Sequence, residues 1–133
     1  MATFVRFEDI ESWKKARVLA SDLYRVTSVG LLSRDFGLSD QLRRAGVSVM
    51  ANIAEGFGCG GNREFGQFLA IAHGSCSEVK SHLYLSTDAG LLTAEDFERL
   101  FKLASEAEAL ISGLMKYLQR SDIKGRKYPP IIN

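Results

Sequence analysis

The chain has 133 residues, of which 46% are hydrophobic and 25% are charged, and its formal net charge is +1. This length suffices for one domain with its own core, and the composition is typical of a globular protein, which excludes a disordered chain. So small a net charge argues against nucleic-acid binding over the whole surface, and no run approaches the roughly 18 consecutive apolar residues of a membrane span.

The opening residues and the cysteines indicate the cellular compartment. The first fifteen residues carry acids and no long apolar core, so they resemble neither a secretion signal nor a transit peptide. Two cysteines, Cys59 and Cys76, are too few for a disulfide framework. We therefore expect reduced thiols, a cytoplasmic location and no membrane partner.

The first predicted helix begins after Asp9, which is a good N-cap residue, and ends near Val29, before Gly30. Small and apolar residues recur along one of its faces: Trp13, Ala16, Ala20, Leu23 and Thr27. An irregular connection over residues 31–38 follows. Ser39 is then expected to cap the second helix, which ends at the glycines within residues 56–61.

The third and fourth predicted helices follow at short intervals. Asn62 is expected to cap the third, which runs to Gly90, and Thr93 is expected to cap the fourth, with Asp96 at its third helical position. Apolar residues of the fourth helix alternate at spacings of three and four: Phe97, Leu100, Ala104, Ala107, Ile111, Leu114 and Leu118. This 3.5-residue period favours nearly antiparallel packing, at about 20 degrees.

Four amphipathic helices with short connections and no strand pattern predict an all-α fold, an antiparallel up-down-up-down four-helix bundle. We expect the bundle over residues 1–121 and a basic, proline-containing tail over residues 122–133. The tail is read as a solvated run of charge, as a basic contact to RNA, or as an apolar hook that docks on a neighbouring subunit. Its basic residues are Lys124, Arg126 and Lys127, together with the preceding Arg120.

The second predicted helix carries two stripes side by side. The polar stripe consists of Gln41, Arg44, Ser48, Asn52 and Glu55, and the apolar stripe of Leu42, Ala45, Val49, Ile53 and Gly56. Polar groups beside a core are costly to bury unpaired, so the stripe predicts a shared polar network, either inside the fold or between subunits.

Particular roles can be assigned within this stripe. Arg44 is expected to pair with Glu78 of an antiparallel third helix, with phosphate binding as the alternative role. Arg43 points about 100 degrees away from Arg44 and faces solvent, a partner or nucleic acid. Asn52 and Glu55 are expected to bind the backbone of the loop that follows.

Small residues form a further pattern on the second and third helices. They are Gly66, Ala70, Gly74, Ser77 and Ser81 on the third helix, and Ala45, Gly46, Ala51 and Ala54 on the second. Glycine inside a helix costs about 0.5–1 kcal/mol relative to alanine, so close contact must compensate for it. The contact is either tight packing within the bundle or a subunit interface.

Catalytic and metal-binding patterns find no support. His73, Cys76, His82 and Cys59 have the wrong spacing for a zinc finger, and the chain has no paired Glu-x-x-His motif for a di-iron site. The glycine-rich loop lacks the Lys-Ser or Lys-Thr ending of a P-loop, and no G-x-S-x-G elbow is present. We expect no catalytic residue, no metal and no cofactor, and hence no enzyme.

Two stretches carry a resemblance to a known family: QLRRAGVSVMANIAEG at residues 41–56 and NREFGQFLAIAHGSCSEVKSHL at residues 62–83. With the opening segment from Phe7 and the FGLSDQLRRA entry, they resemble the 23S rRNA intervening-sequence protein, or S23 ribosomal protein, family as far as Leu118. The most specific pieces are the Arg43–Arg44 pair, the NIAEG motif and the GSxxE motif that ends at Glu78. Gly46, where alanine is common, and the glycine-rich loop depart from the family pattern.

The resemblance implies a small cytosolic bacterial four-helix bundle without established enzymatic activity. Relatives include the accessory protein of diversity-generating retroelements, a basic pentameric ring that engages a reverse transcriptase and nucleic acid. The resemblance therefore implies a homo-oligomer, a pentamer, acting as an assembly or interaction module. The alternative that it implies is an RNA-associated protein that binds rRNA, or a complex of reverse transcriptase and nucleic acid, through basic patches.

Overall fold

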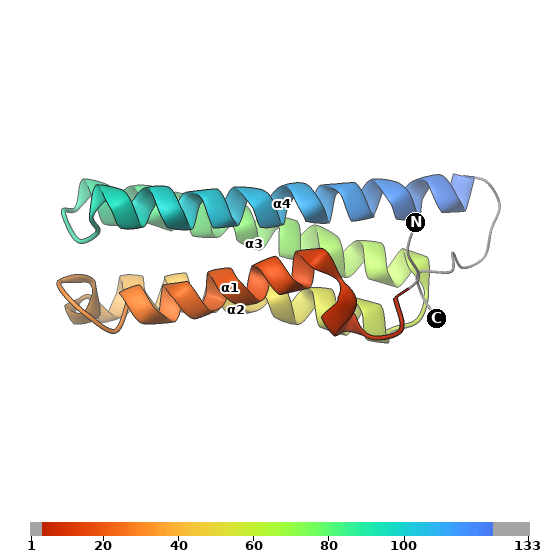
Figure 1. Ribbon diagram of the computed structural model, residues 1–133, viewed down its shortest axis with the longest axis horizontal. Coiled ribbons are helices and arrows are strands. Elements are labelled where there is room, and N and C mark those ends of the chain that lie inside the picture. Colours follow the sequence, from red (N-terminus) through yellow and green to blue (C-terminus); the bar gives the residue numbers. More distant parts are fainter. Residues whose placement is uncertain (1–3, 124–133) are drawn as a thin grey trace.

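The computed structural model describes residues 4–123 and contains four long α-helices and two short 3₁₀ helices in this range (Figure 1). The elements are η1 (Phe7–Asp9), α1 (Glu11–Val26), η2 (Leu32–Arg34), α2 (Phe36–Gly58), α3 (Asn62–Asp88) and α4 (Ala94–Ile123). Each long helix packs against the helix that precedes or follows it, and α4 returns to α1. The predicted all-α up-down-up-down bundle is confirmed.

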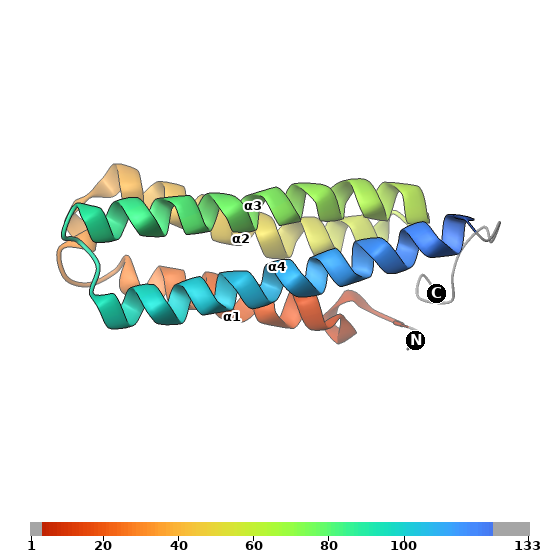
Figure 2. The ribbon, with the colours of Figure 1, turned by 90° about the horizontal axis from the view of Figure 1, so that it is seen from above.

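Two views at right angles show how the helices are arranged. Figure 1 shows α4 and α3 above α1 and α2, and Figure 2 shows α1 and α4 on one side with α2 and α3 on the other. The connections α1–α2 and α3–α4 lie at one end of the bundle, and the short α2–α3 turn lies at the other (Figures 1 and 2).

The core follows the predicted stripes closely. On α2, all five residues of the apolar stripe are buried, from Leu42 to Gly56. On α4, six of the seven predicted residues are buried, and Phe97 is half-buried. Burying each leucine or isoleucine contributes roughly 1.5–3 kcal/mol, so these stripes supply most of the driving force for folding.

The helix starts differ from the prediction at three of four places. α1 is capped by Ile10 because Asp9 belongs to η1. α2 begins earlier than expected, because Asp35 is its cap and accepts a hydrogen bond from the backbone of Leu38 at 3.0 Å. Ser39 is buried inside α2, where its hydroxyl donates to the carbonyl of Leu32 at 2.6 Å.

The other two starts lie at the α2–α3 and α3–α4 connections. Asn62 is the first residue of α3 and not its cap, which is Gly61. Thr93 does cap α4, because its hydroxyl accepts from the backbone of Asp96 at 3.1 Å. Glycines follow the C-caps of α2 and α3: Gly60 and Gly90 have φ values of 87° and 74°, a conformation that costs other residues more.

Candidate interaction surfaces

The polar stripe of α2 forms a smaller network than predicted. The hydroxyls of Ser48 on α2 and Ser75 on α3 lie 2.7 Å apart and share a hydrogen bond. Asn52 donates to the carbonyl and to the hydroxyl of Ser48, at 2.8 and 3.0 Å. These three residues join α2 to α3, whereas Gln41 and Glu55 are exposed and make no side-chain hydrogen bond to another described residue.

The predicted pair between Arg44 and Glu78 is wrong within one chain. Arg44 binds Asp40 on its own helix, Nε to Oδ2 at 2.8 Å, and Oε2 of Glu78 lies 3.3 Å from Nε2 of His82. Both partners are one helical turn away, so each side chain has its contact on its own helix and none crosses between α2 and α3. Asp40 and His82 are the nearer partners, and the predicted pairing did not take them into account.

The expected bond from Asn52 to the following loop is also wrong. Asn52 bonds back into its own helix, one turn earlier. The turn is closed by backbone groups alone: the N–H groups of Cys59 and Gly60 donate to the carbonyls of Gly56 and Phe57. Glycines can close such a turn without help from a side chain.

Arg43 has a structural position that the sequence did not predict. Its Nε donates to Oγ1 of Thr27 at 2.7 Å and its Nη2 to Oγ of Ser28 at 3.0 Å. The guanidinium also lies 4.3 Å from the ring centroid of Tyr24, a cation–π contact. Arg43 thus ties α2 to the end of α1, where a positive charge suits the helix dipole. The other predicted nucleic-acid contacts, Lys124, Arg126 and Lys127, lie outside the described residues.

The small residues of α2 and α3 have different roles. Ala45 and Gly46 pack inside the bundle, and a Cβ on Gly46 would lie 2.7 Å from Cδ1 of Leu23. On α3, Ala70, Gly74, Ser77 and Ser81 are exposed, and a Cβ on Gly74 would meet no atom within 4 Å. Tight packing within the bundle therefore explains Ala45 and Gly46 but not the exposed Gly74.

Exposed apolar side chains accompany the small residues of α3. Ile71 is 53% exposed, Tyr84 54% and Leu85 55%. We call Ile71, Gly74, Ser77, Ser81 and Leu85 the outer α3 face. An exposed face that combines small and apolar residues is typical of a contact surface between proteins.

Two clusters of charged side chains, which the sequence did not predict, join α1 to α4 and α3 to α4. Asp22 of α1 is held by Arg99 of α4 and by Arg25 of its own helix, and Arg99 also binds Asp96. Burial raises the pKa of Asp22, but hydrogen bonds and charge from the two arginines outweigh burial and leave this pKa below its usual value. Carboxylates and arginines 77 residues apart carry no sequence signal of their pairing.

The second cluster joins α3 and α4 around Glu108. Lys80 donates to Oε1 at 2.6 Å, Ser77 donates to Oε2 at 3.2 Å, and His73 lies 3.9 Å from Oε2. Burial raises the pKa of Glu108, but Lys80 chiefly, with Ser77 and His73, brings it below its usual value. Burial, with the charge of Glu108, raises the pKa of the nearby Cys76 thiol to about 12, so that this thiol stays protonated and unreactive.

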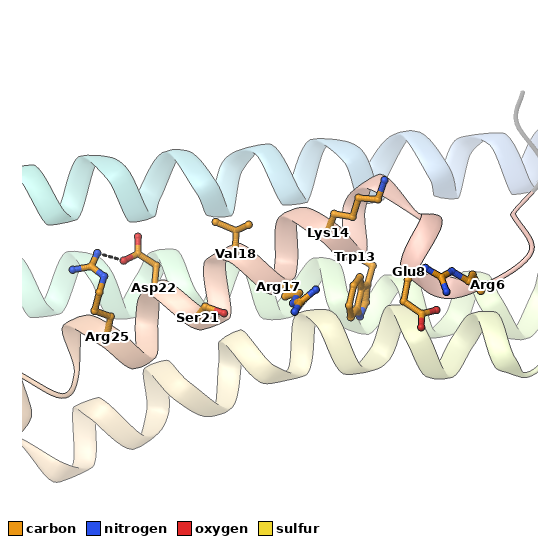
Figure 3. A pocket seen from close by; sticks show the side chains of 9 residues that line it. All are labelled: Arg6, Glu8, Trp13, Lys14, Arg17, Val18, Ser21, Asp22 and Arg25. Atoms are coloured by element: carbon orange, nitrogen blue, oxygen red, sulfur yellow. Dashed lines mark hydrogen bonds and ion pairs between the residues drawn. The ribbon is translucent and has the colours of Figure 1, made fainter.

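A groove of about 760 Å³ runs along the outer side of α1. Its lining side chains are Arg6, Glu8, Trp13, Lys14, Arg17, Val18, Ser21, Asp22 and Arg25. Figure 3 shows them spread from the Asp22–Arg25 ion pair at one end to Arg6 and Glu8 at the other. The guanidinium of Arg17 lies 5.7 Å from the ring centroid of Trp13. Four cations, two carboxylates and an aromatic ring thus share one open surface.

Two further observations concern the described residues alone. Over residues 4–123, no three His, Cys, Asp or Glu side chains are grouped closely enough to hold a metal ion. Within the same range, every helix is too short or too polar to cross a membrane.

Comparison with known proteins gives the chain its family. The crystal structure of a protein of unknown function from the S23 ribosomal protein family of Bacteroides thetaiotaomicron is similar, with a TM-score of 0.74 and 24% sequence identity over 79% of this chain and 95% of that one. This likeness supports the fold. No curated protein matches the chain. The family model described as 23S rRNA-intervening sequence protein matches residues 8–113, and the chain therefore belongs to that family.

Proposed function

We propose that the protein is a non-enzymatic cytoplasmic module that assembles as a homo-oligomer through the outer α3 face. The observation that carries this proposal is that the exposed apolar side chains of Ile71 and Leu85 share one face of α3 with Gly74. Gly74 lies in the interior of a 27-residue helix, is exposed, and has no atom within 4 Å of the position of a Cβ. Glycine at such a position costs up to about 1 kcal/mol relative to alanine, and packing within the chain does not compensate for this cost.

A second copy of the chain could pack closely against α3 at Gly74, where no side chain is in the way. Small residues let two helix axes approach to the short end of the 8–10 Å range, and Ile71 and Leu85 would then lose exposed apolar surface. The number of copies, five, is part of the proposal and comes from the resemblance to the ring-forming accessory protein. In a pentameric ring, each of the five identical contacts would join this face of one copy to a different surface of the next copy.

Replacing Gly74 with arginine tests assembly through this face. The fold should be kept, because nothing lies within 4 Å of the new Cβ and arginine is the better helix former. Light scattering should show the wild-type chain as a pentamer and the Gly74→Arg variant as a smaller species. Gly113→Arg is the matched control, because Gly113 of α4 is also exposed and also has nothing within 4 Å. A monomeric wild-type chain, or equal sizes of both variants, would refute the proposal.

The α1 groove favours a second candidate function, association with RNA. Arg17 stands in this groove beside Trp13 and forms no ion pair with another described residue, so its charge is available to a phosphate. The expected effect of Arg17→Gln is weaker binding to rRNA and a shallower dependence of affinity on salt, by about one unit of slope. Arg44→Gln on α2 is the control and should leave both unchanged. Equal salt slopes for the two variants would argue against this function.

A further inference from the structure

A second groove lies between the start of α3 and the last turns of α4. Its volume is about 350 Å³, and its lining includes Asn62, Arg63, Gly66, Ala70, Met115 and Gln119. A neighbouring hollow of about 280 Å³ shares Ala70, Met115 and Gln119 and extends the surface toward His73. We call this surface the α3/α4 groove. It is distinct from the α1 groove and from the outer α3 face.

Asn62, which lines the α3/α4 groove, has a side-chain amide without hydrogen-bond partners in the described part of the chain. The residue is only 3% exposed, and neither Nδ2 nor Oδ1 has a hydrogen-bond partner among the described residues. A buried polar group without a partner costs about 1–3 kcal/mol, and an amide has both a donor and an acceptor to satisfy. A peptide backbone offers a matching pair, a carbonyl and an N–H.

The rest of the groove suits an apolar peptide. Gly66 leaves open space, because a Cβ there would meet nothing within 4 Å, and Met115 is a side chain that adapts to irregular shapes. Gln119 and Arg63 stand beside this floor as further polar groups. An apolar floor with a few hydrogen-bonding groups is the usual build of a peptide-binding groove.

We propose that residues 128–132 of the same chain, Tyr-Pro-Pro-Ile-Ile, bind in the α3/α4 groove with their backbone on Asn62. These residues lie outside the described range. Gln119 is four residues, or about 6 Å, before the end of α4 at Ile123. The four residues 124–127 can span up to about 13 Å, which is enough to return the chain to the groove.

The chemistry of this segment fits the site. Pro129 and Pro130 fix their own φ angles, so an extended segment loses little entropy on binding. Their carbonyls are acceptors for Nδ2 of Asn62, and the N–H groups of Ile131 and Ile132 are donors for Oδ1. Because Nδ2 and Oδ1 of Asn62 are both buried, the proposal requires this side chain to turn toward the groove before it can form the two bonds. Tyr128 and the isoleucines supply apolar surface for Met115 and the space over Gly66.

Disulfide trapping in the full-length chain tests this proposal. Gln67 also lines the α3/α4 groove and is exposed. In a Cys59→Ser background, Gln67→Cys is combined with Lys127→Cys, which precedes the proposed segment. The matched control combines Glu55→Cys with Lys127→Cys, because Glu55 is exposed on α2 near the same end of the bundle. The buried Cys76 stays unreactive, as its pKa of about 12 implies. In a glutathione buffer, the groove pair should show at least a tenfold higher effective concentration than the control pair.

The outcomes separate the alternatives. Equal effective concentrations for the two pairs would overturn the proposal, and so would a disulfide that joins two chains, because the segment would then belong to a neighbour. Asn62→Leu removes the amide and, with it, the unpaired polar atoms, so this variant should fold. We expect it to lower the effective concentration of the groove pair severalfold, and an unchanged value would overturn the role of Asn62. A disulfide within one chain can form whether or not copies assemble, so the result is independent of the proposed oligomer.

Discussion

Arg99 of α4 binds Asp22 of α1 through two hydrogen bonds, from Nε to Oδ2 at 2.7 Å and from Nη2 to Oδ1 at 3.1 Å. The side chain of Asp22 is only 11% exposed, and that of Arg99 is 40% exposed. A two-bonded pair of this kind fixes both the distance and the rotation of the helices it joins. It therefore sets how α1 and α4 meet where the last helix returns to the first.

Replacing Arg99 with leucine should destabilise the bundle. The change leaves a mostly buried carboxylate with Arg25 as its remaining arginine, so we expect a loss of about 1–3 kcal/mol in the free energy of unfolding. Urea unfolding followed by circular dichroism measures it. Arg44→Leu removes an exposed ion pair within one helix and should change stability by less than about 0.5 kcal/mol. Similar losses in both variants would contradict a special role for Arg99.

Stability should fall in acid because of Asp22 and Glu108. Both carboxyls have a pKa in the folded chain below its usual value, so the folded state binds their protons less readily than the unfolded state. Their contribution is therefore complete above the unfolded-state pKa of about 4, and it is lost as the pH falls through the lower, folded-state pKa. Urea midpoints measured between pH 7 and pH 3 should show this decline. The double variant Asp22→Asn, Glu108→Gln should decline less steeply over the same range.

The sequence predicted the bundle well because a bundle depends on periodicity. The spacing of Leu100, Ala104 and Ile111 alone identifies the buried side of α4, and the structure buries all three. The cap at Thr93 was equally predictable, because its hydroxyl acts within one turn. Ser39 was misjudged for the opposite reason: its hydroxyl binds Leu32, seven residues earlier, and its pattern resembles that of a cap.

The polar contacts between helices were less predictable. In a bundle, an arginine such as Arg44 can pair with a carboxylate on its own helix or on a neighbouring helix, and the sequence does not say which. In the structure it pairs with Asp40, one turn away on the same helix. Arg99 and Asp22 are 77 residues apart, so only the closure of α4 on α1 brings them together. The exposure of Gly74 was likewise invisible, because a stripe of small residues looks the same whether it is packed or open.

Removing the side chain of Arg43 should affect stability and not RNA binding. Arg43→Ala breaks two hydrogen bonds, to Thr27 and Ser28, and a cation–π contact with Tyr24. We expect a loss of about 1–2 kcal/mol in the free energy of unfolding. The affinity for rRNA at fixed salt should be the same as that of the wild-type chain. A normal stability with a weaker affinity would instead assign Arg43 to a nucleic-acid surface.

Two glycine-to-alanine changes should have opposite effects on stability. A Cβ on Gly56 would lie 2.6 Å from Cβ of Phe68 and 3.0 Å from Cδ1 of Phe65, so Gly56→Ala forces α2 and α3 apart. We expect a loss of about 1–3 kcal/mol, as for other overpacked positions. Gly113→Ala on α4 meets nothing within 4 Å and should gain up to about 1 kcal/mol from helix propensity. Thermal unfolding of the two variants compares them directly. A gain in both would mean that the α2–α3 contact can widen at little cost, whereas opposite signs would show that Gly56 sets the distance between the two helices.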